Sequence, residues 1–166
     1  MAVIVYKPRY GRDLIEYSRR QLLDPTLATN WAIETFVMVN DEPLDIVAIS
    51  KLTDKAYLMI SSKIFCQNDA GISDDNNVIT YENWVIHESE IDKNLITYLQ
   101  TSNKTDSINL MIKLILKIYN IDLPYLESLP YNLVSYMMQK LNNFLSQLTE
   151  PRDSFDIEDC DLFRDS

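Results

Sequence analysis

The clearest pattern in the chain is a pair of apolar segments on either side of a polar stretch. Residues 56–65 (AYLMISSKIF) and 78–88 (VITYENWVIHE) are interpreted as strands. Serine and lysine interrupt the apolar residues between Ile60 and Ile64, as expected of a sheet with one wet face. The stretch between them, residues 66–77, is rich in Asn, Asp and Ser and indicates a loop. The sequence therefore predicts two paired strands joined by a long polar insert.

Three other segments place apolar residues at helical spacing. The first begins at Asp13 and ends where Pro25 follows, because proline cannot continue a helix. Residues 107–119 are apolar nearly all round, which is typical of a helix buried in the centre of a fold. Residues 132–148 form the third helix, although 131–138 taken alone could equally start as a strand.

The remaining segments predict short strands and two further helices. Residues 3–8 predict a short strand or an extended arm that ends at Pro8 and Gly11. Residues 33–39 are rich in β-branched and aromatic side chains and predict a strand. Residues 43–52 follow a polar pair and begin with a proline that suits a first helical turn, so they predict a helix, although their β-branched content also allows a strand. Residues 91–99 predict one more short helix.

Length and composition point to one folded unit with a charged end. The 166 residues, 46% hydrophobic and 24% charged, are typical of a single globular domain. We expect an α/β (α+β) domain over residues 1–150, with a small antiparallel sheet and helices packed on one face. Residues 149–166 carry seven acidic side chains against two arginines. Within them, residues 151–166 predict an acidic tail, either flexible or a short motif that docks on a partner.

Charge and cysteine content narrow the environment and the partners. No apolar run approaches the roughly 20 residues that cross a bilayer, and the N-terminus lacks the pattern of a signal peptide. Cys66 and Cys160 are far apart and form no Cys-x-x-Cys pair, so free thiols in the cytoplasm are expected. The net charge of −10 argues against nucleic acid and anionic lipid as partners.

Signatures of catalysis are missing from the sequence. Only two glycines, Gly11 and Gly71, occur, so a glycine-rich phosphate loop is excluded. The single histidine, His87, argues against His-rich metal centres. We therefore expect a non-enzymatic binding protein with no cofactor, metal ion or small-molecule substrate. The enzymatic alternative requires a pocket of perturbed acids around Glu82 and His87.

Three segments carry a family resemblance. Residues 80–87 (TYENWVIH) look like a central strand in which an acidic residue and a tryptophan precede alternating apolar positions. Residues 107–126 look like a long buried helix that ends in a Leu-Pro turn, and residues 35–39 look like a strand that runs into a middle helix. Together they resemble the HORMA domain family, and within it the autophagy-related protein 101 family. On this resemblance Trp84 and Pro124 are structural anchors.

The resemblance implies a non-enzymatic adaptor in the autophagy-initiation kinase complex. Such a subunit would form a heterodimer with the HORMA domain of autophagy-related protein 13 and stabilise it, in the cytoplasm at the site of autophagosome assembly. Pairing would place the middle helix against its counterpart, with the interface residues Leu44, Asp45, Val47, Lys51 and Leu52; equally, the apolar members could face their own sheet. The polar insert lacks the exposed Trp-Phe pair that many family members use for recruitment.

Two other binding roles remain open from the sequence. The chain could be another HORMA-type adaptor, in a checkpoint or DNA-repair assembly. It could also be a viral-type helical decoy that binds host adaptors, which would require an all-helical chain.

Overall fold

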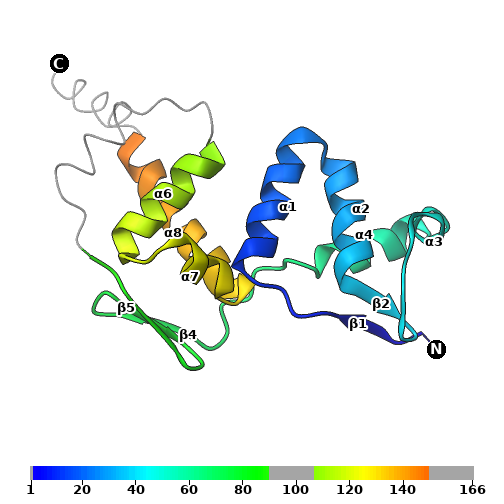
Figure 1. Cartoon of the computed structure of the whole chain (residues 1–166), viewed down its shortest axis with the longest axis horizontal. Helices are drawn as coiled ribbons and strands as arrows, with labels where there is room; N and C mark the ends of the chain where they lie inside the picture. The colour runs from blue at the N-terminus through cyan, green and yellow to red at the C-terminus, as the bar shows by residue number, and fades with distance from the viewer. Residues whose placement is uncertain (1, 90–106, 150–166) are drawn as a thin grey trace, which may run out of the picture.

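The computed structural model describes residues 2–89 and 107–149, and this part of the chain is mixed α+β, as predicted. It contains seven helices and two antiparallel three-stranded sheets (Figure 1). The elements in chain order are β1 (Ile4–Tyr6), α1 (Gly11–Leu23), α2 (Pro25–Phe36), β2 (Val37–Val39), β3 (Glu42–Pro43), α3 (Ile46–Ser50), α4 (Asp54–Ser62), β4 (Ile72–Asp75), β5 (Val78–Tyr81), β6 (Trp84–His87), α6 (Ser107–Tyr119), α7 (Leu123–Ser128) and α8 (Tyr131–Thr149).

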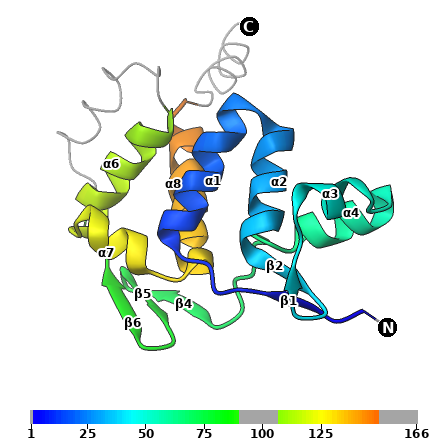
Figure 2. The same ribbon diagram turned by 45° about the vertical axis from the view of Figure 1, so that its right-hand side comes forward.

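The buried apolar residues form two clusters, one on each side of α1 (Figures 1 and 2). The larger cluster joins α6, α7 and α8 to α1 and to strands β5 and β6, and its centre includes Ile79, Ile115 and Met137. The smaller cluster joins α2, α3, α4 and β2, around Ile33 and Ile64. Helix α1 packs on α2 at one side and on α7 and α8 at the other, so it connects the two halves.

The segment before α1 fixes the two halves to each other. The amide of Gly11 donates to the carbonyl of Leu129 (2.7 Å), and the amide of Tyr131 donates to the carbonyl of Arg9 (3.1 Å). The Arg9 guanidinium lies over the rings of Tyr6 and Tyr131 and donates to the carbonyl of Ile64 (2.8 Å). Cation–π contacts and a charged hydrogen bond therefore hold the smaller cluster against the start of α8.

The strand predicted for residues 33–39 is wrong over its first half. Asp24 accepts hydrogen bonds from the amides of Thr26 and Leu27, so α2 begins at Pro25 directly after α1 ends. The helix continues to Phe36, and only Val37–Val39 is a strand. The buried residues Ala28, Ala32 and Phe36 recur every four positions, which is the helical period that the β-rich composition concealed.

The strand predicted for residues 56–65 is also wrong, because α4 occupies most of it. The Thr53 hydroxyl accepts a hydrogen bond from the amide of Ala56 (3.1 Å) and caps the helix. Ile60 and Ile64, four residues apart, are both buried in the smaller cluster. Leu58, two residues before Ile60, is 66% exposed, whereas a strand would place residues two apart on the same face, so the burial pattern has the helical period.

The predicted hairpin is replaced by a three-stranded meander further along the chain. The supposed loop 66–77 contains β4, and the supposed strand 78–88 is two strands, β5 and β6, that turn at Glu82 with φ 53°. Asn76 and Asn77 both have positive φ and form the two-residue turn between β4 and β5. The strands therefore form two separate sheets, β1-β2-β3 and β4-β5-β6, rather than one.

The predictions for the other helices hold with changed bounds. Helices α1, α6 and α8 match the three segments with helical spacing. The helix predicted over residues 43–52 is reduced to the short α3, because residues 42–43 pair with β2. The Leu-Pro turn predicted at Leu123 is instead the start of α7, capped by Asp122. The helix predicted at residues 91–99 lies outside the described residues.

Candidate functional site

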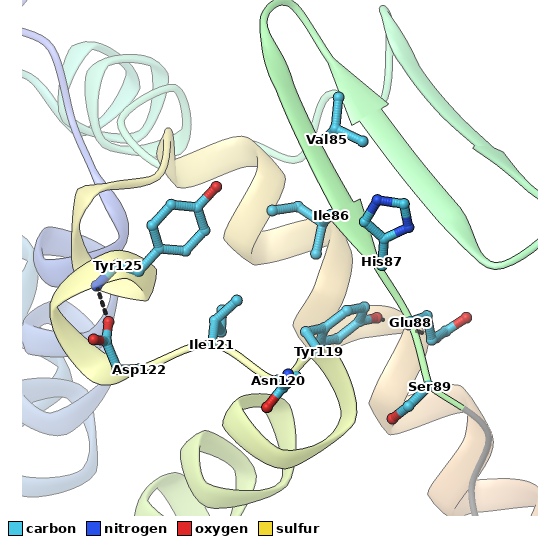
Figure 3. A pocket seen from close by; sticks show the side chains of 10 residues that line it. All are labelled: Val85, Ile86, His87, Glu88, Ser89, Tyr119, Asn120, Ile121, Asp122 and Tyr125. Carbon is cyan, nitrogen blue, oxygen red and sulfur yellow. Dashed lines mark hydrogen bonds between the residues drawn. The ribbon is translucent and has the colours of Figure 1, made fainter.

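A cavity of about 630 Å³ lies between β6 and the connection from α6 to α7 (Figure 3). The amide and the hydroxyl of Ser89 both donate to the carbonyl of Ile118 (2.8 and 2.6 Å), so the end of β6 is fixed to the end of α6. Asn120, with φ 53°, turns the chain out of α6, and Asp122 accepts from the amide of Tyr125 (3.0 Å) to start α7. The polar side chains of Ser89 and Asp122 are therefore already engaged in holding the backbone.

Beside this cavity, Lys140 links two carboxylates from different parts of the chain. Its ammonium group donates to Asp74 Oδ2 (2.8 Å) on β4 and to Glu88 Oε1 (2.9 Å), just after β6. The Tyr136 hydroxyl donates to the same Asp74 oxygen (2.7 Å), and the Tyr119 hydroxyl donates to Glu88 Oε2 (3.3 Å). We call these five residues the lysine cluster. It joins the β4-β5-β6 sheet to α6 and α8.

The lysine cluster favours fixed charges rather than proton transfer. Burial alone raises the pKa of Asp74, but hydrogen bonds from Lys140 and Tyr136 outweigh it and hold the pKa below the usual value. Burial lowers the pKa of Lys140, and its bonds to Asp74 and Glu88 reverse this and raise it. Burial, with the nearby Glu88, raises the pKa of Tyr119 far above its usual value. At neutral pH Asp74 is ionised, Lys140 is charged and Tyr119 stays protonated, as a structural clamp requires.

The two residues considered for catalysis are not brought together. Glu82 lies exposed in the turn before β6, whereas His87 is the last residue of that strand. At about 3.3 Å per residue they are separated by roughly 16 Å along the strand. His87 and Glu88 do line the cavity, but Glu82 does not. Within residues 2–89 and 107–149, no three His, Cys, Asp or Glu side chains are grouped to hold a metal ion.

The predicted interface residues divide into two sets in the structure. Leu44 and Leu52 pack against the smaller cluster, so these two face their own domain. Val47 is exposed (56%), and Asp45 and Lys51 are exposed on either side of α3. Asp45 also caps α3 by accepting from the amide of Ala48 (2.8 Å).

Helices α3 and α4 present more exposed apolar side chains than the sequence indicated. They are Ile46 and Val47 on α3, and Leu58 and Met59 on α4, with Leu58 66% exposed. Figures 1 and 2 both place α3 and α4 together at the edge of the molecule away from α6. We call these four side chains the α3–α4 face. Leu58 and Met59 were missed because residues 56–65 were interpreted as a strand; helical numbering places Leu58 opposite Ile60.

The two predicted anchor residues have different environments. The Trp84 ring packs edge-on against the Tyr125 ring, with centroids 5.8 Å apart, and contacts the larger cluster. It thereby attaches the β4-β5-β6 sheet to α7. Pro124 is exposed in the first turn of α7, where its missing amide hydrogen costs no helical hydrogen bond.

No family model, curated protein or solved structure matches this chain. The HORMA resemblance therefore stays a prediction that rests on the sequence segments described above. The two sheets do not agree with the all-helical chain that a helical decoy requires. Among the helices that the structure describes, none combines the length and the apolar character needed to cross a bilayer.

Proposed function

We propose that this chain is a non-enzymatic adaptor that binds another protein through the α3–α4 face. The observation that carries the proposal is the exposure of four apolar side chains on two consecutive short helices. Isolated exposed apolar residues are ordinary, whereas several on adjoining elements mark interaction sites. Asp45 and Lys51 add charges of both signs beside them, as at the polar rim of an interface.

The proposed partner is the HORMA domain of autophagy-related protein 13, within the autophagy-initiation kinase complex in the cytoplasm. Support for this identity comes from the sequence resemblance alone. Val47 belongs both to the α3–α4 face and to the interface residues that the resemblance implies. Leu58 and Met59 extend the proposed interface beyond those residues.

The test is co-expression of the chain with that HORMA domain, followed by size-exclusion chromatography. Val47→Asp should abolish the heterodimer, whereas Val85→Asp should leave it intact. These two variants are matched, because both replace an exposed valine (56% and 52%) and Val85 lies on β6, far from α3. Leu44→Asp is less informative, because Leu44 packs against the smaller cluster and its loss would disturb folding.

Smaller truncations should weaken the heterodimer by a measurable amount. Leu58→Ala is expected to cost about 1–2 kcal/mol of binding free energy, or roughly 5- to 30-fold in Kd. A heterodimer that forms equally well with Val47→Asp and Leu58→Ala would refute binding through this face. Absence of any heterodimer with the wild-type chain would refute the proposed partner.

A further inference from the structure

A second group of exposed apolar side chains lies where α1 ends and α2 begins. Leu22, Leu23 and Leu27 are all more than 60% exposed, and Leu23 reaches 88%. We call these three the leucine corner. Asp24, which lies between them, accepts hydrogen bonds from the amides of Thr26 and Leu27, so its carboxylate is engaged in capping α2. The corner is separate from the α3–α4 face in both sequence and position (Figure 2).

Helix α1, which ends at the leucine corner, and helix α6, which Arg19 of α1 contacts, are basic in a chain that is strongly acidic overall. The two helices together carry five basic and two acidic side chains, a net charge of +3, while the chain carries −10. The basic residues are Arg12, Arg19, Arg20, Lys113 and Lys117. This local field attracts an anionic segment despite the net charge of the chain.

Arg19 lies one helical turn before the leucine corner. Its guanidinium donates to the neutral amide oxygen of Asn109 at the start of α6 (2.8 Å). None of the ion pairs within residues 2–89 and 107–149 uses Arg19, whereas the neighbouring Arg20 is paired with Glu16 (2.8 Å). Arg19 can therefore pair with a carboxylate without breaking an existing ion pair.

The chain leaves its last described helix at the same end of the molecule. In Figures 1 and 2 the C-terminal end of α1, the N-terminal end of α6 and the C-terminal end of α8 all lie at the upper edge of the molecule, and Figure 1 shows the start of α6 between the other two. Helix α8 packs on both α1 and α6. The chain therefore leaves α8, toward residues 151–166, at the same edge of the molecule as the leucine corner and across the start of α6 from it.

The chemistry of the acidic tail complements this surface. Residues 151–166 carry six acidic side chains and two arginines, a net charge of −4, and four large apolar residues lie among the acids: Phe155, Ile157, Leu162 and Phe163. A chain of about eleven residues spans roughly 17–20 Å on average as a random coil, and up to about 40 Å when fully extended. The apolar residues of the tail can thus reach the end of α1.

We propose that the acidic tail docks on the leucine corner of the same molecule. Its apolar side chains cover Leu22, Leu23 and Leu27, and its carboxylates pair with Arg19 and the other cations of α1 and α6. Burial of apolar area drives the contact, and charge selects this face over the acidic remainder of the chain. A partner that binds either the tail or the leucine corner must first separate the tail from the corner.

The native thiol of Cys160 in the tail allows a direct test on the full chain. Cys66→Ser removes the other cysteine, and a new cysteine is placed at the corner (Leu23→Cys) or at the matched exposed position on β6 (Val85→Cys). Disulfide formation with Cys160 is followed under oxidised glutathione by non-reducing electrophoresis and mass spectrometry. Leu22→Cys serves as a second corner variant if the first fails to fold.

Neutralising the tail separates docking from simple tethering. The same variants are prepared with Asp156, Glu158, Asp159 and Asp161 changed to their amides, which leaves the tether length unchanged. We compare the rate of disulfide formation at the corner with the rate at β6, because their ratio cancels any change in the reactivity of Cys160. We expect this ratio to fall at least roughly fivefold on neutralisation, because docking raises the effective concentration of the tail at the corner.

Two results would overturn the proposal. An unchanged ratio for the acidic and neutral tails would show that the tail reaches the corner only by its tether. Disulfides that form mainly between molecules would assign the corner to the tail of a second copy. An intramolecular disulfide at the corner that depends on the acidic side chains supports the proposal.

Discussion

Replacing Gly11 with alanine tests the close approach of α1 to α7. Gly11 is buried at the first position of α1, and a Cβ there would overlap the carbonyl oxygen of Leu126 and lie 2.9 Å from Cγ2 of Val134. Neither neighbour can yield easily, because one is backbone and the other side chain is fully buried. Overpacking of this kind costs about 1–3 kcal/mol, and better helix propensity returns at most about 1 kcal/mol.

We therefore expect Gly11→Ala to lower the free energy of unfolding by about 2 kcal/mol. With a urea dependence of about 2 kcal/mol per molar, the unfolding midpoint should fall by about 1 M. Unfolding is followed by circular dichroism and by fluorescence of Trp31 and Trp84, which contact the smaller and the larger cluster respectively. Gln21→Ala, on the exposed part of the same helix, is the control. An unchanged or higher midpoint for Gly11→Ala would refute the close approach of the two helices.

Other predictions follow from the clamp, the corrected helix and a strained turn. Lys140→Met should cost about 1–2 kcal/mol in urea unfolding, because two carboxylates lose their cation. Since the folded pKa of Asp74 lies below its unfolded value, the stability that this group contributes is present at neutral pH and lost as pH falls through the folded pKa. Lowering the pH from 7 to 3 should therefore reduce the free energy of unfolding, measured in urea, more for wild type than for Asp74→Asn. If the free energy of unfolding falls with pH equally in both proteins, this linkage is contradicted. Ile60→Ala should lower the free energy of unfolding by about 2–4 kcal/mol, and Leu58→Ala by less than about 0.5 kcal/mol. Similar losses for the two variants would favour the strand predicted for residues 56–65, because a strand places both side chains on one face. Glu82→Gly should raise the free energy of unfolding by about 0.5–1 kcal/mol, and with it the midpoint of thermal unfolding, because glycine adopts a positive φ without strain. A lower midpoint would contradict the turn at Glu82.

Some elements could be predicted because their signals are local. Residues 107–119 are apolar around almost the whole helix, and among residues 108–119, whose burial is described, only the stripe of Asn109, Lys113 and Lys117 is exposed, as the sequence indicates. Pro25 ends α1 at the expected place because its ring is incompatible with a continuing helix. Such signals act within a few residues and need no tertiary partner.

Other elements could not be predicted because their periods are ambiguous over a short segment. In residues 56–65 the apolar positions satisfy both a strand and a helix. Only the burial of Ile60, with Leu58 left exposed two residues earlier, selects the helix. In residues 78–88 nothing in the composition shows that the chain reverses at Glu82, an unusual residue for positive φ. Pairing of Ile79 with Ile86 in the larger cluster determines that reversal.

The candidate surfaces show the same division. Val47 could be selected from the sequence, but Leu58 and Met59 required α4 to be known as a helix. The lysine cluster unites residues 74, 88, 119, 136 and 140, whose sequence positions carry no common motif. The sequence by itself determined the mixed fold class, the long apolar helices and the acidic end of the chain, because composition and helix-ending residues act locally. The tertiary structure decided which short segments are strands and which side chains meet, because that choice depends on burial against residues far away in the chain.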